Sequence, residues 1–228
     1  MSAAIMMIVA ALMYGLVMAQ FSAWSTKRTL NERSRELTDP TLRGHIDRMA
    51  DALDLPTIKV NLYEVEQVNG LAAPDGRIFI TRGFYDRYKS GEVTADEISS
   101  VIAHELGHVA LGHSRRRMID FSTQNAMRTA LALILSRFIP GVGPWIANAL
   151  TSLLAARLSR EDEYEADAYA TALLMKAGIG SKGQKSLFGK LDKLTQSRAG
   201  AVPAWLLSHP KSDERIAAIE ANEARWQA

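Results

Sequence analysis

The sequence predicts an α+β protein that is mostly helical, with a small antiparallel sheet and an N-terminal transmembrane helix. Two observations predict the globular part. Residues typical of helix starts occur at two places, and the segments between them are short, rich in strand-forming residues and separated by turn residues. A third supports the N-terminal helix, because residues 3–24 are mostly apolar and carry no charge. The chain has 228 residues, 47% of them hydrophobic, which is enough for the core of one ordinary domain.

Residues 1–25 are predicted to form a membrane anchor. About 20 apolar residues suffice for a helix to cross a bilayer, and Trp24 suits the interface at its end. A cleaved signal peptide is the alternative, with residues 17–19 as a weak cleavage site, but no Lys or Arg precedes the apolar run. The basic residues that follow favour a cytoplasmic location for the rest of the chain, residues 26–228, although the opposite orientation stays open.

The first globular helix is expected to start at Asp39, a good N-cap, with Pro40 at the first helical position. Apolar residues then recur at helical spacing: Leu42, Ile46, Met49 and Leu53. Residues 58–63 are predicted to form a strand. The turn signals Asn69-Gly70 and Pro74-Asp75-Gly76 separate it from a second strand at 77–81. We expect an antiparallel sheet, with the 77–81 strand as a candidate edge for an extended peptide.

A second apolar region covers residues 126–158. Arg128, Arg137 and the Pro-Gly-Val-Gly-Pro run at 140–144 interrupt it, so each half has roughly 14 residues, short of a membrane span. We expect a helical hairpin that packs on the domain or lies at the membrane surface. A re-entrant membrane hairpin is the alternative.

Composition excludes several classes of function. The chain has no Cys, which excludes disulfides, thiolate zinc sites and a Cys nucleophile. Its net charge is only +2 and its basic residues are scattered, so no nucleic-acid partner is expected.

The candidate catalytic helix begins at a capping box, Thr94 to Glu97, and is expected to run to about Met118. It carries His104-Glu105-Leu106-Gly107-His108. Two His residues four apart lie on one helix face and can bind the same metal ion. A Glu after the first His can act as a general base. Gly107 lets another backbone approach closely.

A third His ligand further along this helix is disfavoured. The extended His-Glu-x-x-His-x-x-Gly-x-x-His pattern would need Gly and His where Leu111 and Ser114 stand. His113 lies five residues past His108, about 140° around a helix. We therefore expect His113 to face solvent or to support a ligand.

The acidic run at residues 159–170 offers another third ligand. Glu163 shares its helix face with Ala166, Asp167 and Ala170, a stripe small enough to lie against another helix, whereas the neighbouring acids Glu161 and Glu165 point elsewhere. Asp167 is placed to accept a hydrogen bond from the free ring nitrogen of a zinc-bound His.

Three motifs in order, VIAHELGHVALGHS, SREDEYEADAYA and LLSHPKSDERI, with the strand region NGLAAPDGRIFITRGF before them, resemble the HtpX-like and CAAX-prenyl-endopeptidase-like zinc metallopeptidases. The resemblance covers about residues 40–220. It implies a zincin-like fold and one Zn²⁺ per chain. It also implies roles for six residues: zinc ligands His104, His108 and Glu163, general base Glu105, supporting Asp167, and His209 as the group that stabilises the oxyanion. The multi-span membrane body of the prenyl-processing members is missing, which puts prenylated substrates in doubt.

The expected function is that of a membrane-anchored zinc endopeptidase for unfolded or membrane-associated polypeptides, in protein quality control. Glu105 would take the proton from the attacking water and pass it to the leaving amine. One alternative keeps the zinc in a membrane chaperone or adaptor with little or no proteolysis. Another is a structural membrane protein with a chance motif. The oligomeric state is open.

Overall fold

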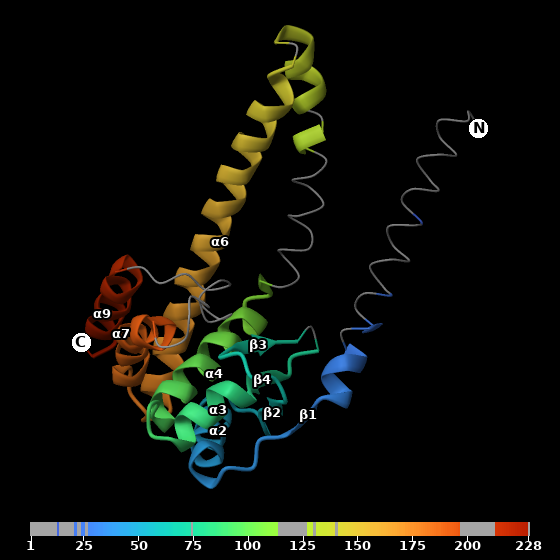
Figure 1. The fold of residues 1–228 in the computed structure, drawn as a ribbon. Helices are drawn as coiled ribbons and strands as arrows, with labels where there is room; N and C mark the ends of the chain where they lie inside the picture. The colour runs from blue at the N-terminus through green and yellow to red at the C-terminus, as the bar shows by residue number, and fades with distance from the viewer. Residues whose placement is uncertain are drawn as a thin grey trace.

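The computed structural model describes residues 27–73, 75–113, 127–129, 131–139, 141–196 and 213–227, with Met13, Phe21, Trp24 and Ser25; the side chains of 154–157, 191–196 and 227 are not among them. The larger elements follow in this order: β1 (Ser34–Glu36), α2 (Pro40–Ala52), β2 (Val60–Tyr63), β3 (Gly70–Ala72), β4 (Ile78–Thr81), α3 (Arg82–Lys89), α4 (Ala95–Ala110), α6 (Gly143–Lys176), α7 (Lys182–Gln196) and α9 (Asp213–Gln227). Helices predominate and the sheet is small (Figure 1).

The sheet has the strand order β1-β2-β4-β3 and is mixed. Its outer pairs, β1 with β2 and β3 with β4, are antiparallel as predicted, but the central pair β2 and β4 is parallel, so the prediction of a purely antiparallel sheet was wrong. All four residues of β4 are buried, which suits a strand flanked on both sides. The prediction that 77–81 forms an edge was therefore also wrong. Within the described chain the edge facing α4 is β3.

Helix α2 starts where the sequence predicts. The Asp39 carboxylate accepts hydrogen bonds from the backbone N–H groups of Thr41 and Leu42, at 3.1 and 3.2 Å, and Pro40 occupies the first turn. The apolar residues of the predicted stripe face the core, and three of them are fully buried: Leu42, Ile46 and Met49.

Helix α4 also starts as predicted, because both hydrogen bonds of the capping box are present between Thr94 and Glu97. It ends at Ala110, earlier than the predicted Met118. The N–H of Leu111 closes the last turn on the carbonyl of Gly107, and Gly112 adopts a left-handed backbone with φ +69°. This conformation terminates helices, and Gly adopts it at little cost. His113, the next residue, therefore leaves the helix axis.

The apolar hairpin has two helical arms in the structure. Residues 127–129 and 131–138 form the first arm, and the second is the beginning of α6, which continues without interruption for 34 residues to Lys176. Of the two placements expected for the hairpin, packing on the domain does not hold, because both arms extend away from the sheet and α4 (Figure 1). The placement at a membrane surface stays a prediction. Large apolar side chains on these arms are mostly exposed: Leu133, Ile134, Phe138, Trp145, Leu150 and Leu153.

The predicted N-terminal anchor falls mainly on residues outside those that the structure describes. Among the described residues, no helix combines the length and the apolar character needed to cross a bilayer. Met13, Phe21 and Trp24 are described, and each is more than half exposed.

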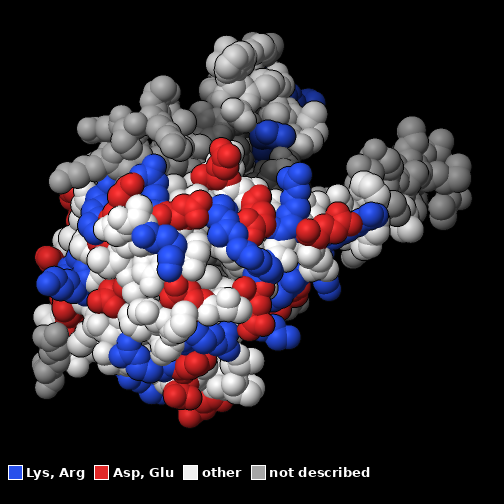
Figure 2. Space-filling view, turned by 60° about the horizontal axis from the view of Figure 1, so that its bottom comes forward, with Lys and Arg blue, Asp and Glu red and all other residues white. Residues whose placement is uncertain are grey.

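The face of the protein below α2 and α3 carries both signs of charge. Basic and acidic side chains are intermixed over the described surface in this view (Figure 2). Opposite charges also pair among the described residues, as Arg82 does with Glu64 at 2.7 Å. On this side, the described surface therefore has no extended region of positive or negative electrostatic potential.

Candidate metal centre

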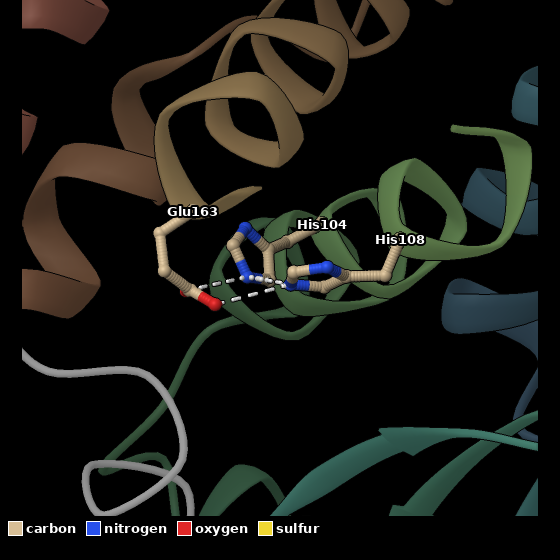
Figure 3. Close-up of side chains that lie close together, drawn as sticks. All are labelled: His104, His108 and Glu163. Carbon is tan, nitrogen blue, oxygen red and sulfur yellow. Dashed lines mark hydrogen bonds and ion pairs between the residues drawn. The ribbon is translucent and has the colours of Figure 1, made fainter. Parts of the chain in front are cut away.

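Three side chains from two helices converge at the contact between α4 and α6. His104 and His108 extend from α4, one turn apart, and Glu163 extends from α6 towards them (Figure 3). The two Nε2 atoms lie 3.1 Å apart, and each lies 3.4 Å from one carboxylate oxygen of Glu163. All three residues are buried. The structure thus brings together the three residues assigned as ligands from the sequence.

These distances fit the geometry of a tetrahedral zinc site. Ligand atoms that lie about 2.0–2.1 Å from a tetrahedral zinc ion are separated from one another by about 3.3–3.4 Å. The three separations between His104, His108 and Glu163 match that spacing closely, and two imidazoles with one carboxylate form a donor set typical of catalytic zinc. The residues present therefore fit the metal that the sequence implies.

The close contact of α4 and α6 depends on small residues. A Cβ at Gly107 would lie only 3.0 Å from the carbonyl oxygen of Ala166 and 3.1 Å from its Cα. Ala166 and Ala170 on α6 are fully buried at this contact. The stripe predicted around Glu163 therefore packs on the His-bearing helix, and this packing brings Glu163 within reach of both imidazoles.

Asp167 fixes the orientation of His104. Its Oδ1 lies 2.9 Å from His104 Nδ1, whereas the other ring nitrogen, Nε2, faces Glu163. Burial alone would lower the pKa of His104, but the hydrogen bonds and charges of Asp167 and Glu163 outweigh it and raise this pKa to about 9. Without metal, His104 therefore carries a proton at neutral pH, which metal binding must displace.

His108 behaves differently from His104. Burial lowers its pKa, and the neighbouring charge of His104 adds to that effect although Glu163 opposes it. A neutral imidazole is the form that binds metal, so His108 is ready to act as a ligand.

Arg215 is a member of the site that the sequence reasoning missed. It extends from α9, is buried, and donates to both carboxylate oxygens of Asp167 at 2.6 and 2.9 Å, while lying 3.3 Å from Glu163. Burial would raise the pKa of Asp167, but the hydrogen bonds from His104 and Arg215 lower it below its usual value. A signal was available, because Arg215 is one helical turn before the buried Ile219 and so occupies an apolar helix face.

Glu105, the predicted general base, lies in the same buried region. A Cβ at Gly70, the first residue of β3, would lie 3.7 Å from the Glu105 Cγ. The carboxylate side chain is therefore next to the edge strand as well as next to the two His residues in sequence.

His113 does not follow the helical projection used in the sequence reasoning. Because α4 ends at Ala110, His113 turns back and its Nδ1 lies 2.8 Å from His108 Nδ1. It is fully buried, so the alternative that it faces solvent was wrong. His209 and Ser114 lie outside the described residues.

A small sheet packed on a helix with two His ligands and a Glu, and a third ligand on a later helix, is typical of a metallopeptidase domain. The model of peptidase family M48 matches residues 36–223, and the chain belongs to this family. The resemblance to HtpX-like zinc metallopeptidases is thereby confirmed.

The chain is similar to several named proteases. It is 32% identical to metalloprotease LoiP of Escherichia coli over 69% of this chain and 60% of LoiP. It is 30% identical to metalloprotease YcaL of the same organism, over 69% and 59%, and 21% identical to an HtpX homologue of Variovorax paradoxus, over 90% and 79%. The chain thus spans about three fifths of the length of LoiP and YcaL.

Proposed function

We propose that this chain is a zinc-dependent endopeptidase with His104, His108 and Glu163 as its metal ligands. The observation that carries this proposal is that the buried side chains of His104 and His108 on α4 and of Glu163 on α6 place their ligand atoms 3.1 to 3.4 Å apart. Helix α4 also bears the buried Glu105. Membership of peptidase family M48 supports it. One Zn²⁺ per chain is expected.

Glu105 is the proposed general base. A zinc ion bound at this site would polarise the scissile carbonyl and lower the pKa of water to about 7. Glu105 accepts the proton of the attacking water and then donates it to the leaving amine nitrogen. Asp167 and Arg215 hold His104 in the orientation that presents Nε2 to the metal. His209 remains the proposed partner of the oxyanion, on the resemblance alone.

An extended substrate would pair with β3. Strand β3 bonds to β4 on one side, is next to α4, and has no other described strand beside it. Since Glu105 lies next to Gly70, a peptide paired along β3 would bring a backbone carbonyl close to the general base. Such pairing uses the peptide backbone more than its side chains, and it requires an unfolded segment. We therefore propose unfolded or membrane-associated polypeptides as substrates, in protein quality control.

The substrate proposal predicts cleavage of an unfolded protein at internal bonds. The zinc-loaded protein is expected to cut casein into fragments, whereas a tightly folded protein such as green fluorescent protein stays intact under the same conditions. Mass spectrometry of the fragments identifies the bonds cut, and a chelator followed by added Zn²⁺ serves as the control. Release of single terminal residues, or equal cleavage of both proteins, would contradict an endopeptidase that pairs with extended chain.

We further propose that the protein is bound to a membrane through two apolar parts, residues 1–25 and the tip of the hairpin. At the tip, Trp145 and Phe138 are 77% and 76% exposed. Large exposed apolar patches mark contacts with lipid or protein, and aromatic residues favour the bilayer interface. The apolar run of residues 3–24 supports lipid as the contact.

The membrane proposal can be tested with single cysteines, because the chain has none of its own. A polarity-sensitive fluorophore on Trp145→Cys is expected to shift to the blue in lipid vesicles and to be quenched by brominated lipids. The same fluorophore on Ser90→Cys, exposed at the end of α3, should show neither change. Equal spectra for both labels in vesicles would show that the tip stays in water and would contradict the lipid contact.

A further inference from the structure

His113 is a buried histidine outside the set of proposed metal ligands. It reaches the site only because α4 ends at Ala110 and Gly112 turns the chain back. Its side chain is fully buried, and both ring nitrogens contact polar atoms.

The two contacts of His113 connect α4 with α6. On one side its Nδ1 lies 2.8 Å from Nδ1 of His108. On the other its Nε2 lies 3.0 Å from Oε2 of Glu165 and 3.8 Å from Oδ1 of Asp162. Glu165, two residues after Glu163 on α6, is therefore bonded to His113. The sequence had given Glu165 no place in the site.

The positions of the protons follow from the metal-facing atoms. His108 presents Nε2 to Glu163 and to Nε2 of His104, so Nε2 is the nitrogen that binds metal. A neutral imidazole bound through Nε2 carries its proton on Nδ1. The N–H of His108 therefore donates, and Nδ1 of His113 must accept. The proton of His113 is then on Nε2, where it donates to Glu165.

We propose that His113 is a positioning residue for the metal centre: as the acceptor from His108 and the donor to Glu165, it fixes the tautomer and ring orientation of His108. This inference rests on the ligand assignment of the proposed function. His113 supports His108 as Asp167 supports His104, so each imidazole ligand has one partner of its own. Such supporting hydrogen bonds also raise the basicity of the ligand.

A second metal site is the competing explanation. His113, Asp162 and Glu165 each offer a ligand atom within 4.8 Å of the others. A metal on Nε2 of His113 would place the His113 proton on Nδ1, directly facing the N–H of His108 at 2.8 Å. Two donors would then oppose each other, so the contact between the two histidines favours one metal ion per chain.

The proposal is tested with two substitutions of His113 in the full chain. His113→Leu removes the acceptor at similar size, whereas His113→Asn keeps an amide oxygen near the position of Nδ1. We expect the zinc affinity, measured by competition with a chelator, to fall about 10- to 100-fold in His113→Leu and to stay within a few-fold of wild type in His113→Asn. The visible spectrum of bound Co²⁺ should change in the first variant only. His45→Leu, at a histidine of α2 bonded to Ser99, is the matched control.

A second pair of variants avoids the buried position. Glu165 is half exposed, so Glu165→Ala should fold normally, and it is expected to weaken zinc binding several-fold relative to Glu161→Ala, an exposed acid on the same helix. With only five His in the chain, ¹⁵N NMR of the zinc-loaded protein should identify His113 as the Nε2–H tautomer.

The outcomes separate this inference from the proposed function. Unchanged zinc affinity in His113→Leu and Glu165→Ala, or an Nδ1–H tautomer of His113, would overturn the positioning role and leave the ligand set intact. Two zinc ions per chain, with one lost in Glu165→Ala, would establish the second site instead. Zinc binding that survives Glu163→Ala would refute the ligand set itself.

Discussion

The Glu105→Gln variant is expected to bind zinc as tightly as the wild type and to lose nearly all peptidase activity. The amide has nearly the same shape as the carboxylate but cannot accept the proton of the attacking water. General acid–base groups contribute about 10²- to 10⁴-fold to such reactions, and Glu105 is proposed to act both as the base and as the acid, so we expect kcat to fall by about that factor. Metal content by atomic absorption and casein cleavage measure the two properties separately.

The control for this variant is Glu66→Gln, an exposed acid on the loop between β2 and β3. It should keep both zinc and activity. Full activity in Glu105→Gln would refute the mechanism. The same variant also separates a peptidase from a chaperone or adaptor, because rescue of a stress phenotype by Glu105→Gln to the wild-type level would favour the chaperone or adaptor.

The second large effect is expected for Glu163→Ala, which should lose its metal. Glu163 is the only proposed ligand that α6 supplies, and its two oxygens lie 3.4 Å from the two His nitrogens. Removing it leaves two ligands where catalytic zinc sites have three. The affinity should therefore fall further than the about 10- to 100-fold that follows loss of a supporting residue.

Two further variants make the Glu163 result specific. Glu163→Gln keeps the side-chain volume, so a comparable loss of zinc in that variant would exclude a packing defect as the cause. Glu161→Ala, two residues earlier on the same helix, should retain zinc because Glu161 is exposed. If Glu161→Ala loses its metal while Glu163→Ala keeps it, the assignment of the helix face is wrong.

Features set by neighbouring residues were predictable from the sequence. Asp39 and Thr94 mark helix starts through hydrogen bonds made within three residues of the cap. The 3.6-residue period put His104 with His108 on one face, and Glu163 with Asp167 on another. The structure brings these two helix faces into contact, because His104 lies 3.4 Å from Glu163 and 2.9 Å from Asp167.

Features set by distant contacts were not predictable in this way. Strand β4 lies between β2 and β3 and pairs with β2 in parallel, and alternation along a single strand reports neither its neighbours nor the direction of pairing. Arg215 meets Asp167 across 48 residues, through the docking of α9 on α6. The place of His113 depended on one Gly with a left-handed backbone, and a helical projection continued past that residue put His113 in the wrong direction.

In the proposed membrane-bound peptidase, the unbroken length of α6 would set the distance between the bilayer and the bond to be cut. Trp145, at the exposed tip, and Glu163 belong to one helix. The 18 steps from Trp145 to Glu163 along the helix correspond to about 27 Å, at about 1.5 Å per residue. With the tip at the bilayer surface, the metal centre stands up to that height above the lipid. A polypeptide leaving the membrane in extended form covers this distance with about eight residues. On this proposal, peptide bonds that lie closer to the bilayer than about 27 Å would escape cleavage unless the substrate is first drawn outward.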